Sequence, residues 1–388
     1  MTSADATGDL TIAGRLLRPD DGFDRWLLEH APLWSRSARF MRRMMAVPGW
    51  SVGPLSIENG TLHIGGWAVS PRFALRPPSL LVNGRRVRRV SWPEPRTDID
   101  NFFWYVPQRL RGGLTARVPL EDVDRDGDGI EVGAVWRTAG GRHRLSSFFM
   151  CRPEADVYPL PDAQRRMRVH GGTEESAFRL VGYTSMRQVD GALRTVMNRP
   201  LNSFASILDW GCGCGRLTRY LGGTTSAITG VDIDSDSVAW CATNLPFGHF
   251  LHIEPDPPMP MPAGGFELVI GISIFTHLSE EDQWAWLREL HRVLAPGGIA
   301  AVTVSGNAAV ARSGIPVPFV GHWLHVGFLD VGHSTDLDGA VDQPDRYRNV
   351  VHTASYVDTK WPSAGFTIAG RIPAAIGGHQ DLVLLQRT

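Results

Sequence analysis

An acid followed by three alternating glycines is the most informative feature of this sequence. The stretch I-L-D-W-G-C-G-C-G-R covers residues 207–216, so an apolar strand end leads into Asp209 and then into a glycine-rich loop. The three glycines are Gly211, Gly213 and Gly215. Glycine tolerates positive φ and lets a ligand lie against bare backbone. Residues 216–221 can begin a helix, whose N-terminus favours negative charge. The pattern predicts a strand–loop–helix unit that cradles a ligand.

The glycine spacing narrows the kind of ligand. A dinucleotide-binding loop reads G-x-G-x-x-G, and its third glycine packs the helix against the strand. Here the third glycine comes one residue early, and Arg216 stands where the dinucleotide pattern has glycine. A second apolar strand, from about Ser226 to Asp232, ends in an acid about twenty residues past the loop, where nucleotide-binding folds hold ribose hydroxyls.

The rest of the C-terminal half alternates strands with helices. Further strands are expected at 249–253, 266–273, 299–304, 365–371 and 381–386, with helices at 238–244 and 280–294. Such alternation favours a parallel sheet covered by helices. The pattern D-x-G-x-G-x-G, the acid at 232 and the strand order, with a helix ending in L-x-P-G-G at 294–298, resemble the class I S-adenosylmethionine-dependent methyltransferases. The resemblance runs from about residue 207 to the C-terminus. It implies an α/β fold with a Rossmann-like, doubly wound, mostly parallel seven-stranded sheet, and S-adenosyl-L-methionine as cofactor.

The resemblance also implies roles for individual residues. Asp209 orients the glycine loop or meets the cofactor amine, the glycines admit the methionyl part, and Asp232 pairs with the ribose hydroxyls. Ile233 packs on adenine, and either Glu254 or Asp256 reads the adenine amine, because the proline-rich loop 254–262 leaves the register open. The expected cofactor-binding residues are Asp209, Gly211, Cys212, Gly213, Asp232, Ile233, Glu254, Asp256 and Ser273. The alternative role for Asp232 is that of a helix cap.

Three residues are candidates for catalysis. His277 follows the fourth strand and is either a general base for a hydroxyl acceptor or a structural residue that holds its loop. His352 and Asp358 are further candidate bases. Both lie in a long insertion, residues 306–360, that is expected to cap the substrate pocket and set the choice of acceptor.

A helical layer over residues 152–205 is expected to connect the domains and cover the cofactor. Within it, Tyr183, Thr184 and Arg187 are candidates to contact the methionine carboxylate, with core packing or surface exposure as the alternative for each. The catalytic domain then extends over residues 206–388.

Residues 50–151 have a different character. Short alternating segments are separated by turn signals such as Asn59-Gly60 and Asn83-Gly84, which predicts an antiparallel β-sandwich. The segment G-W-A-V at 66–69 and the strands after it loosely resemble modules of bacterial glycan-processing transferases; a plain structural module is the alternative. Residues 1–49 are expected to form a tail and a short amphipathic helical segment, for which docking on its own protein is favoured over peripheral membrane contact.

Two histidines in the insertion have a metal-ligand spacing. His322 and His325 would share one face of a helix and could be joined by Asp330 or His333. No helix start or stop signal frames the pair, so no metal site is predicted.

Composition excludes several classes of protein. The net charge of −1 argues against nucleic-acid binding, which usually needs a basic excess. Only four cysteines occur, and neither a signal peptide nor a membrane-length apolar run is present, so a cytoplasmic location is expected.

The leading functional hypothesis is methyl transfer to a small-molecule or carbohydrate acceptor, in particular to a hydroxyl. The alternatives are a non-catalytic cofactor-binding or assembly subunit that works through the β-sandwich, and an NAD-dependent oxidoreductase, which the glycine spacing disfavours. The sequence leaves open the acceptor, the choice between O- and N-methylation, and the oligomeric state.

Overall fold

The computed structural model describes residues 49–69, 78–96, 111–123, 127, 129–138, 141–144, 147–152, 156–224, 226–312, 317–335 and 346–388. The expected helical segment within residues 1–49 lies outside these ranges. The chain divides into two compact units. One comprises the residues up to Met150 together with Ala308–Val326, and the other comprises Cys151–Asn307 and Gly327–Thr388. The predicted helical layer at 152–205 thus groups with the C-terminal unit, whereas part of the predicted cap groups with the N-terminal one.

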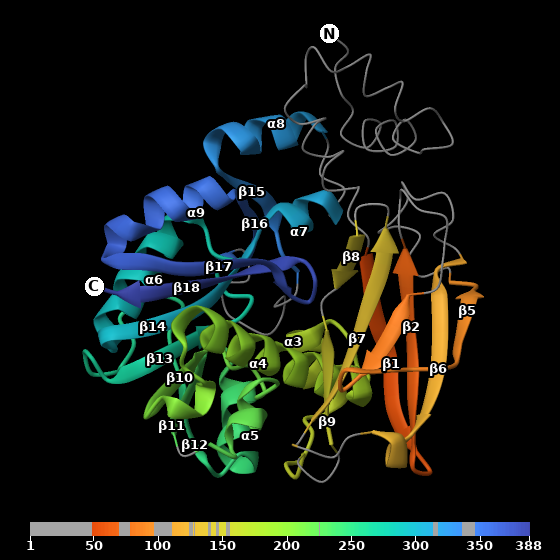
Figure 1. Cartoon of the computed structure of the whole chain (residues 1–388). Coiled ribbons are helices and arrows are strands. Elements are labelled where there is room, and N and C mark those ends of the chain that lie inside the picture. Colours follow the sequence, from red (N-terminus) through yellow and green to blue (C-terminus); the bar gives the residue numbers. More distant parts are fainter. Residues whose placement is uncertain are drawn as a thin grey trace. The chain divides into compact units, whose positions relative to one another are not determined.

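The N-terminal unit is built on two antiparallel sheets, which confirms the predicted N-terminal β domain (Figure 1). One sheet has the order β1-β2-β6-β5, formed by β1 (Gly49–Glu58), β2 (Thr61–Val69), β6 (Gly113–Pro119) and β5 (Val90–Glu94). The other has the order β4-β3-β7-β8, with β9 also pairing with β7, formed by β4 (Arg85–Arg86), β3 (Ser79–Val82), β7 (Gly129–Thr138), β8 (Gly141–Arg144) and β9 (Phe148–Cys151). A one-turn 3₁₀ helix, η3 (Leu120–Asp122), follows β6, and the helices α7 (Asn307–Arg312) and α8 (Val317–Val326) come from the insertion.

The turns of this unit follow from its asparagine–glycine pairs. Asn59 and Gly60 have φ of 48° and 71°, and Asn83 and Gly84 have φ of 45° and 78°. Two consecutive residues with positive φ suit the tight turns of hairpins, whose twist matches that of the strands. The pairs therefore close the β1–β2 and β3–β4 hairpins where the sequence predicts turns.

The C-terminal unit contains a seven-stranded sheet with the order β12-β11-β10-β13-β14-β18-β17. Its strands are β10 (Ser206–Trp210), β11 (Ala227–Asp232), β12 (Gly248–His252), β13 (Phe266–Gly271), β14 (Leu294–Ser305), β17 (Phe366–Ile376) and β18 (Gln380–Arg387). The first five strands pair in parallel, and β18 pairs antiparallel with both β14 and β17. The predicted Rossmann-like, mostly parallel seven-stranded sheet is confirmed.

Two helices, α3 (Ala163–His170) and α4 (Glu175–Met197), and the 3₁₀ turn η4 (Leu201–Ser203) precede the first strand of this sheet (Figure 1). The connections between its strands contain α5 (Ser235–Asn244), α6 (Glu280–Val293), α9 (Ala354–Lys360) and the 3₁₀ turns η5 (Thr218–Leu221) and η7 (Trp361–Ala364). A separate two-stranded sheet is formed by β15 (Phe328–His333) and β16 (Arg348–His352). Ser279 caps α6, as its spacing to Asp282 predicts: the Ser279 hydroxyl accepts the Asp282 N–H and donates to the Asp282 carboxylate.

The core of this unit lies between the sheet and α6, α9 and η7. Trp210 at the end of β10 packs against Phe275 and Trp286, with ring centroids 5.3 and 5.0 Å away, and the tilted ring of Trp361 packs against Phe275 at 4.8 Å. This aromatic cluster is buried and holds the ends of β10 and β13 together.

The helix predicted after the glycine loop does not form. The loop runs through turns into the single 3₁₀ turn η5. Gly215 has φ of 76°, and the buried guanidinium of Arg219 is held by Asp156 at 2.6 Å, outside the sheet. Glycines at 222 and 223 then follow, so the chain cannot propagate an α-helix at this point.

Candidate functional site

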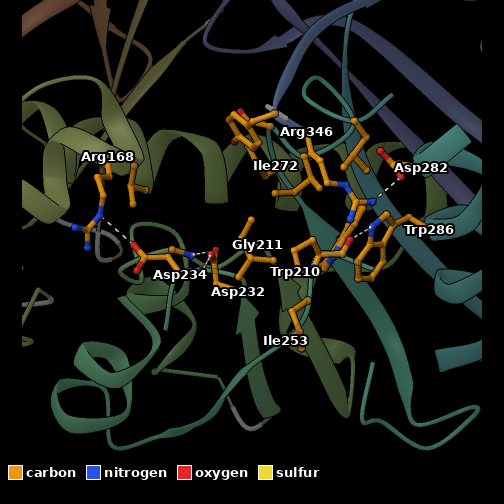
Figure 2. Close-up of a pocket in the computed structure, with 18 of the residues that line it drawn as sticks. Arg168, Trp210, Gly211, Asp232, Asp234, Ile253, Ile272, Asp282, Trp286 and Arg346 are labelled. Atoms are coloured by element: carbon orange, nitrogen blue, oxygen red, sulfur yellow. Dashed lines mark hydrogen bonds and ion pairs between the residues drawn. The ribbon is translucent and has the colours of Figure 1, made fainter. Parts of the chain in front are cut away.

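A cavity of about 170 Å³ opens at the carboxyl ends of the parallel strands (Figure 2). Residues at or just after the ends of four neighbouring strands line it, namely Trp210, Asp232, Ile253 and Ile272. Strand β10 lies between β11 and β13, so successive connections diverge to opposite sides of β10. Ligands of open α/β sheets bind at such a switch point.

The glycine loop forms one wall of the cavity. Gly211 and Gly213 line it, with φ of 78° and 50°. A Cβ atom on Gly211 would lie 2.1 Å from Cδ1 of Ile274, and one on Gly213 would lie 2.8 Å from Cγ2 of Val169. Both positions therefore require glycine for backbone conformation and for space.

Asp232 ties this loop to the end of β11. Its carboxylate accepts the backbone N–H of Gly213 at 2.7 Å and that of Asp234 at 2.9 Å. Burial raises the pKa of Asp232. The cap of α5 is Asp234, which accepts the N–H groups of Asp236 and Ser237, so the alternative role of Asp232 as that cap is excluded.

Two expected cofactor residues lie behind the loop. Asp209 is 3% exposed, does not line the cavity, and accepts the hydroxyl of Thr218. Burial raises the pKa of Asp209 to about 6. Cys212 is also buried and packs beside Cys241. These side chains support the loop from its inner side and do not face the cavity.

Apolar groups form a further part of the cavity lining. Ile233, Ile253 and Pro255 line the cavity, and the indole N–H of Trp286 donates to the carbonyl of Pro255 at 3.3 Å. Glu254 is exposed and does not line the cavity, so the structure does not bring it to the position of an acid that reads adenine.

Asp256, the other candidate for that role, is engaged by an arginine from the insertion. Arg346 lines the cavity and pairs with Asp256 at 2.5 Å. It also pairs with Asp282 at 2.9 Å (Figure 2). The hydrogen bonds from Arg346 lower the pKa of Asp256 and, in return, raise that of the guanidinium. The sequence offered no signal for this pairing beyond the expectation that the insertion covers the site.

Among the described residues, three arginines line the cavity, and they differ in the number of carboxylates with which they form ion pairs. Arg168 of α3 pairs with Asp234 at 3.0 Å (Figure 2) and with Asp236 at 2.7 Å. Arg346 pairs with two carboxylates as described above. Arg216 has no carboxylate within ion-pair distance among the residues that the structure describes, and burial lowers its pKa.

Ser273 is the expected cofactor residue beyond β13, and it lines the cavity. Its φ of 64° is unusual for a residue other than glycine. The conformation is held by its N–H, which donates to Oγ1 of Thr303 at 2.7 Å, and by its hydroxyl, which pairs with the side-chain amide of Gln380.

The three candidate bases do not line the cavity. His277 stacks on Tyr347, and Tyr347 lines the cavity, so the ring of Tyr347 lies between His277 and the cavity. His352 is fully buried in the core, and burial lowers its pKa to about 3. Asp358 is exposed and faces Arg371 at 3.6 Å. The structure thus places His352 in the core and Asp358 at the surface, away from the cavity lining, and their role as bases stays a prediction that this placement does not support.

The residues of α4 that were expected to contact the methionine carboxylate also lie away from the cavity. Tyr183 and Thr184 are buried, Arg187 is exposed, and none of them lines the cavity. The helical layer instead contributes Arg168 and Val169 from α3. Helical periodicity alone did not show which of the two helices lines the cavity.

His322 and His325 both lie on α8, a helix that the sequence did not signal. Within the described ranges no three His, Cys, Asp or Glu side chains gather as a metal site requires. In the same ranges, no helix combines the length and apolar character needed to cross a membrane.

Residues 207–298 match a family described as "Methyltransferase domain". A malonyl-[acyl-carrier protein] O-methyltransferase of Enterobacter lignolyticus is 29% identical over 104 residues, which are 27% of this chain. The match spans 40% of the length of that relative.

Two solved structures are similar at low identity. An S-adenosylmethionine-dependent methyltransferase from Methanosarcina mazei is 15% identical, with 50% of this chain and 96% of that chain covered and a TM-score of 0.36. The 1,6-didemethyltoxoflavin-N1-methyltransferase of Burkholderia thailandensis, solved with S-adenosylhomocysteine, is 16% identical, with 62% and 95% covered and a TM-score of 0.37. The family match, the strand order and the geometry of the glycine loop agree, and the C-terminal half of the chain is a class I S-adenosylmethionine-dependent methyltransferase domain.

Proposed function

We propose that the protein transfers a methyl group from S-adenosylmethionine to a hydroxyl of a small-molecule or glycan-type acceptor. The observation that carries this proposal is the cavity at the strand ends, where Gly211, Gly213 and Asp232 lie on adjoining walls. A cavity with bare backbone on one side and a half-buried carboxylate beside it suits an adenosyl ligand with a ribose diol.

The residues present fit the cofactor. S-adenosylmethionine carries its methyl group on a sulfonium leaving group, so the protein must bind it, aim it and exclude water. Asp232 would accept hydrogen bonds from the ribose hydroxyls. Ile233 and Ile253 offer apolar surface to the adenine, and the two lining glycines leave room for the methionyl part.

Two observations support an oxygen acceptor outside nucleic acids. The curated relative is named an O-methyltransferase. The segment after β13 reads G-I-S-I-F-T-H and has no asparagine–proline–proline–aromatic tetrapeptide of the kind that amino-directed nucleic-acid enzymes carry. Phe275 in that segment is buried in the core against Trp210 and Trp361, so it offers no platform for a base. The net charge of −1 agrees with this.

His277 is proposed as a positioning residue for the acceptor end of the cavity. It holds Tyr347 by ring stacking, and Tyr347 lines the cavity.

The proposal is tested in two steps. Calorimetric titration of the full chain with S-adenosylhomocysteine and with NAD should show binding of the former only; binding of NAD alone would overturn the assignment. A screen with methyl-labelled S-adenosylmethionine should then include sugars, glycolipids, phenols and amines. Label transfer to hydroxyl-bearing acceptors supports the proposal, and transfer only to amines contradicts its oxygen specificity. Cofactor binding with no transfer to any acceptor favours the alternative, a non-catalytic subunit that works through the β domain with carbohydrate or a partner transferase.

A further inference from the structure

One side of the N-terminal unit carries several exposed arginines. Strands β4 and β5 are edge strands of its two sheets, and the chain passes from one to the other through residues 87–89. Arg86, Arg88 and Arg89 are exposed along this path. None of the three forms an ion pair with a carboxylate of the residues that the structure describes. Their positive charges are therefore not neutralised within the described part of the unit.

A fourth arginine extends this charge onto the outer face of the sheet that contains β6. Arg117 of β6 is exposed, whereas its neighbour Ala116 is buried, so the arginine points away from the core. Strand β5 lies beside β6 (Figure 1), and its Val90 pairs with Ala116. One further step of this antiparallel register puts Arg89 opposite Arg117. Arg117 likewise has no ion-pair partner within the described ranges.

We call Arg86, Arg88, Arg89 and Arg117 the arginine cluster. Charged side chains on edge strands prevent edge-to-edge pairing, which accounts for the first three. It does not account for Arg117, because β6 has β2 and β5 on its two sides. Like charges directly opposite each other on neighbouring strands are destabilising. The pair Arg89 and Arg117 therefore costs stability, and an anionic partner would offset that cost.

The surroundings of the cluster favour a lipid surface over a protein as that partner. A protein interface usually has an apolar core within a polar rim. Among the described residues between 49 and 152, no large apolar side chain is exposed. Anionic lipid headgroups attract basic residues without such a core, and clusters of about four to eight arginines or lysines are typical of proteins that adsorb to them. Nucleic acid is the less favoured anion, because the net charge of the chain is −1.

We propose that the arginine cluster docks the N-terminal unit on an anionic lipid surface. The guanidinium groups bind headgroup phosphates through charge-assisted hydrogen bonds. Each arginine close to such a surface strengthens binding about fivefold. The inference does not depend on methyl transfer, because all four arginines belong to the N-terminal unit.

The test measures sedimentation of the full chain with lipid vesicles. The wild-type protein should bind vesicles of phosphatidylcholine mixed with phosphatidylglycerol, but not vesicles of phosphatidylcholine alone. Binding should be lost when the salt concentration rises from about 0.1 M to about 1 M, because the Debye length falls from about 10 Å to about 3 Å. Arg88→Gln/Arg89→Gln should bind the anionic vesicles about 25-fold more weakly, and Arg117→Gln about fivefold. Arg88→Lys/Arg89→Lys keeps both charges and should stay within about threefold of the wild-type affinity.

Arg288→Gln/Lys360→Gln is the matched control, because it removes two exposed cations from the C-terminal unit. This variant should bind the anionic vesicles as the wild-type protein does. Circular dichroism and thermal unfolding show whether each variant folds. If Arg88→Gln/Arg89→Gln does not fold, Arg117→Gln still decides.

Four results would overturn the proposal. The wild-type protein might bind both kinds of vesicle equally or neither kind, the substitutions at 88 and 89 might leave vesicle binding unchanged, or the control might lose as much affinity as they do. Binding to a DNA duplex but to neither vesicle would make nucleic acid the partner instead. Self-association of Arg88→Gln/Arg89→Gln with unchanged vesicle binding would reduce the cluster to protection of the sheet edges.

Discussion

The imidazole of His277 lies almost parallel to the ring of Tyr347, with centroids 4.2 Å apart and planes 9° apart. Nδ1 of His277 is 2.9 Å from the carbonyl oxygen of Arg348, and the N–H of Arg348 donates to the carbonyl of His277 at the same distance. We call residues 346–350 the strap. Since Arg346 and Tyr347 line the cavity, His277 fastens the strap beside that cavity.

Removing the imidazole should loosen the strap. His277→Ala loses the ring stack and the Nδ1 hydrogen bond, each worth about 1 kcal/mol, so S-adenosylhomocysteine should bind about 3- to 10-fold more weakly. His277→Phe keeps the ring and should recover about half of that loss in binding free energy. Calorimetry and stopped-flow dissociation rates measure both effects. If His277 were a general base instead, the two variants would lose methyl transfer equally while cofactor affinity stayed at the wild-type level.

Asp232 should be the carboxylate on which cofactor affinity depends most. Asp232→Asn leaves one oxygen to serve the N–H groups of Gly213 and Asp234 and removes the charge that would face the ribose. We expect S-adenosylhomocysteine to bind at least about 10-fold more weakly, since hydrogen bonds to charged groups contribute about 1.5–3 kcal/mol. Isothermal titration calorimetry measures this change.

Glu254→Gln is the control for that measurement, because Glu254 is exposed and does not line the cavity. The dissociation constant of this variant for S-adenosylhomocysteine should stay within about threefold of the wild-type value, as for most surface substitutions. An equal loss in both variants would restore Glu254 to the role of adenine-reading acid and would contradict the site described above.

Local sequence patterns sufficed for the fold and for the glycine loop. The glycines, the strand ends and the acid at 232 lie within one β–loop–β segment, whose geometry depends on neighbours in sequence. The pairing of Arg346 with Asp256 spans 90 residues and depends on how an irregular insertion folds back, which no periodicity encodes. Similarly, the sequence shows that position 352 is histidine, but only the packing around it shows that the ring is in the core.

The predicted helix after the loop failed for a related reason. Residues 216–221 are themselves compatible with a helix, but Gly222 and Gly223 follow at once and end it after one turn. In addition, the buried guanidinium of Arg219 pairs with Asp156, 63 residues earlier in the chain, a contact that no local pattern encodes.

Gly211 should tolerate no side chain. In Gly211→Ala the new Cβ would overlap Cδ1 of Ile274, and the backbone would remain at a φ of 78°, which costs a residue other than glycine about 1–2 kcal/mol. We expect a lower free energy of unfolding and weaker S-adenosylhomocysteine binding. The double variant Gly211→Ala/Ile274→Ala removes the overlap but not the backbone strain. Its free energy of unfolding should therefore still be lower than that of Ile274→Ala, by less than Gly211→Ala lowers the wild-type value. Urea unfolding of the four proteins measures the coupling.

Gly223→Ala is the matched control, since a Cβ atom there would meet nothing within 4 Å and its φ is not in the left-handed region. It should leave both stability and binding near the wild-type values. Equal destabilisation by the substitutions at 211 and 223 would contradict the steric argument and would point to a general intolerance of the region.

His352 should contribute to the acid sensitivity of the C-terminal unit. Its Nε2 pairs with Oε1 of Gln283 at 2.9 Å, its Nδ1 has no hydrogen-bond partner among the described residues, and burial lowers its pKa to about 3. The unfolded chain, with a histidine pKa of about 6.5, then binds a proton that the folded chain rejects. Stability is therefore fully present above about pH 6.5 and decreases as the pH falls toward about 3, by up to about 1.4 kcal/mol per pH unit from this one group.

His352→Phe keeps a ring among Phe328, Tyr356 and Trp361 but removes the titrating group. This variant should be less stable than the wild-type protein at pH 7.5, because the side-chain oxygen Oε1 of Gln283 loses the hydrogen bond from Nε2 of His352. The difference between the two free energies of unfolding should shrink as the pH falls from 6.5 to 4.5. Urea titrations across this range, followed by circular dichroism, measure that difference. The contribution of His170 to the pH dependence cancels in the difference, because both proteins retain this residue. If the free energies of unfolding of the two proteins instead changed in parallel with pH, His352 would be protonated in the folded protein. That result would contradict a buried, neutral imidazole at this position.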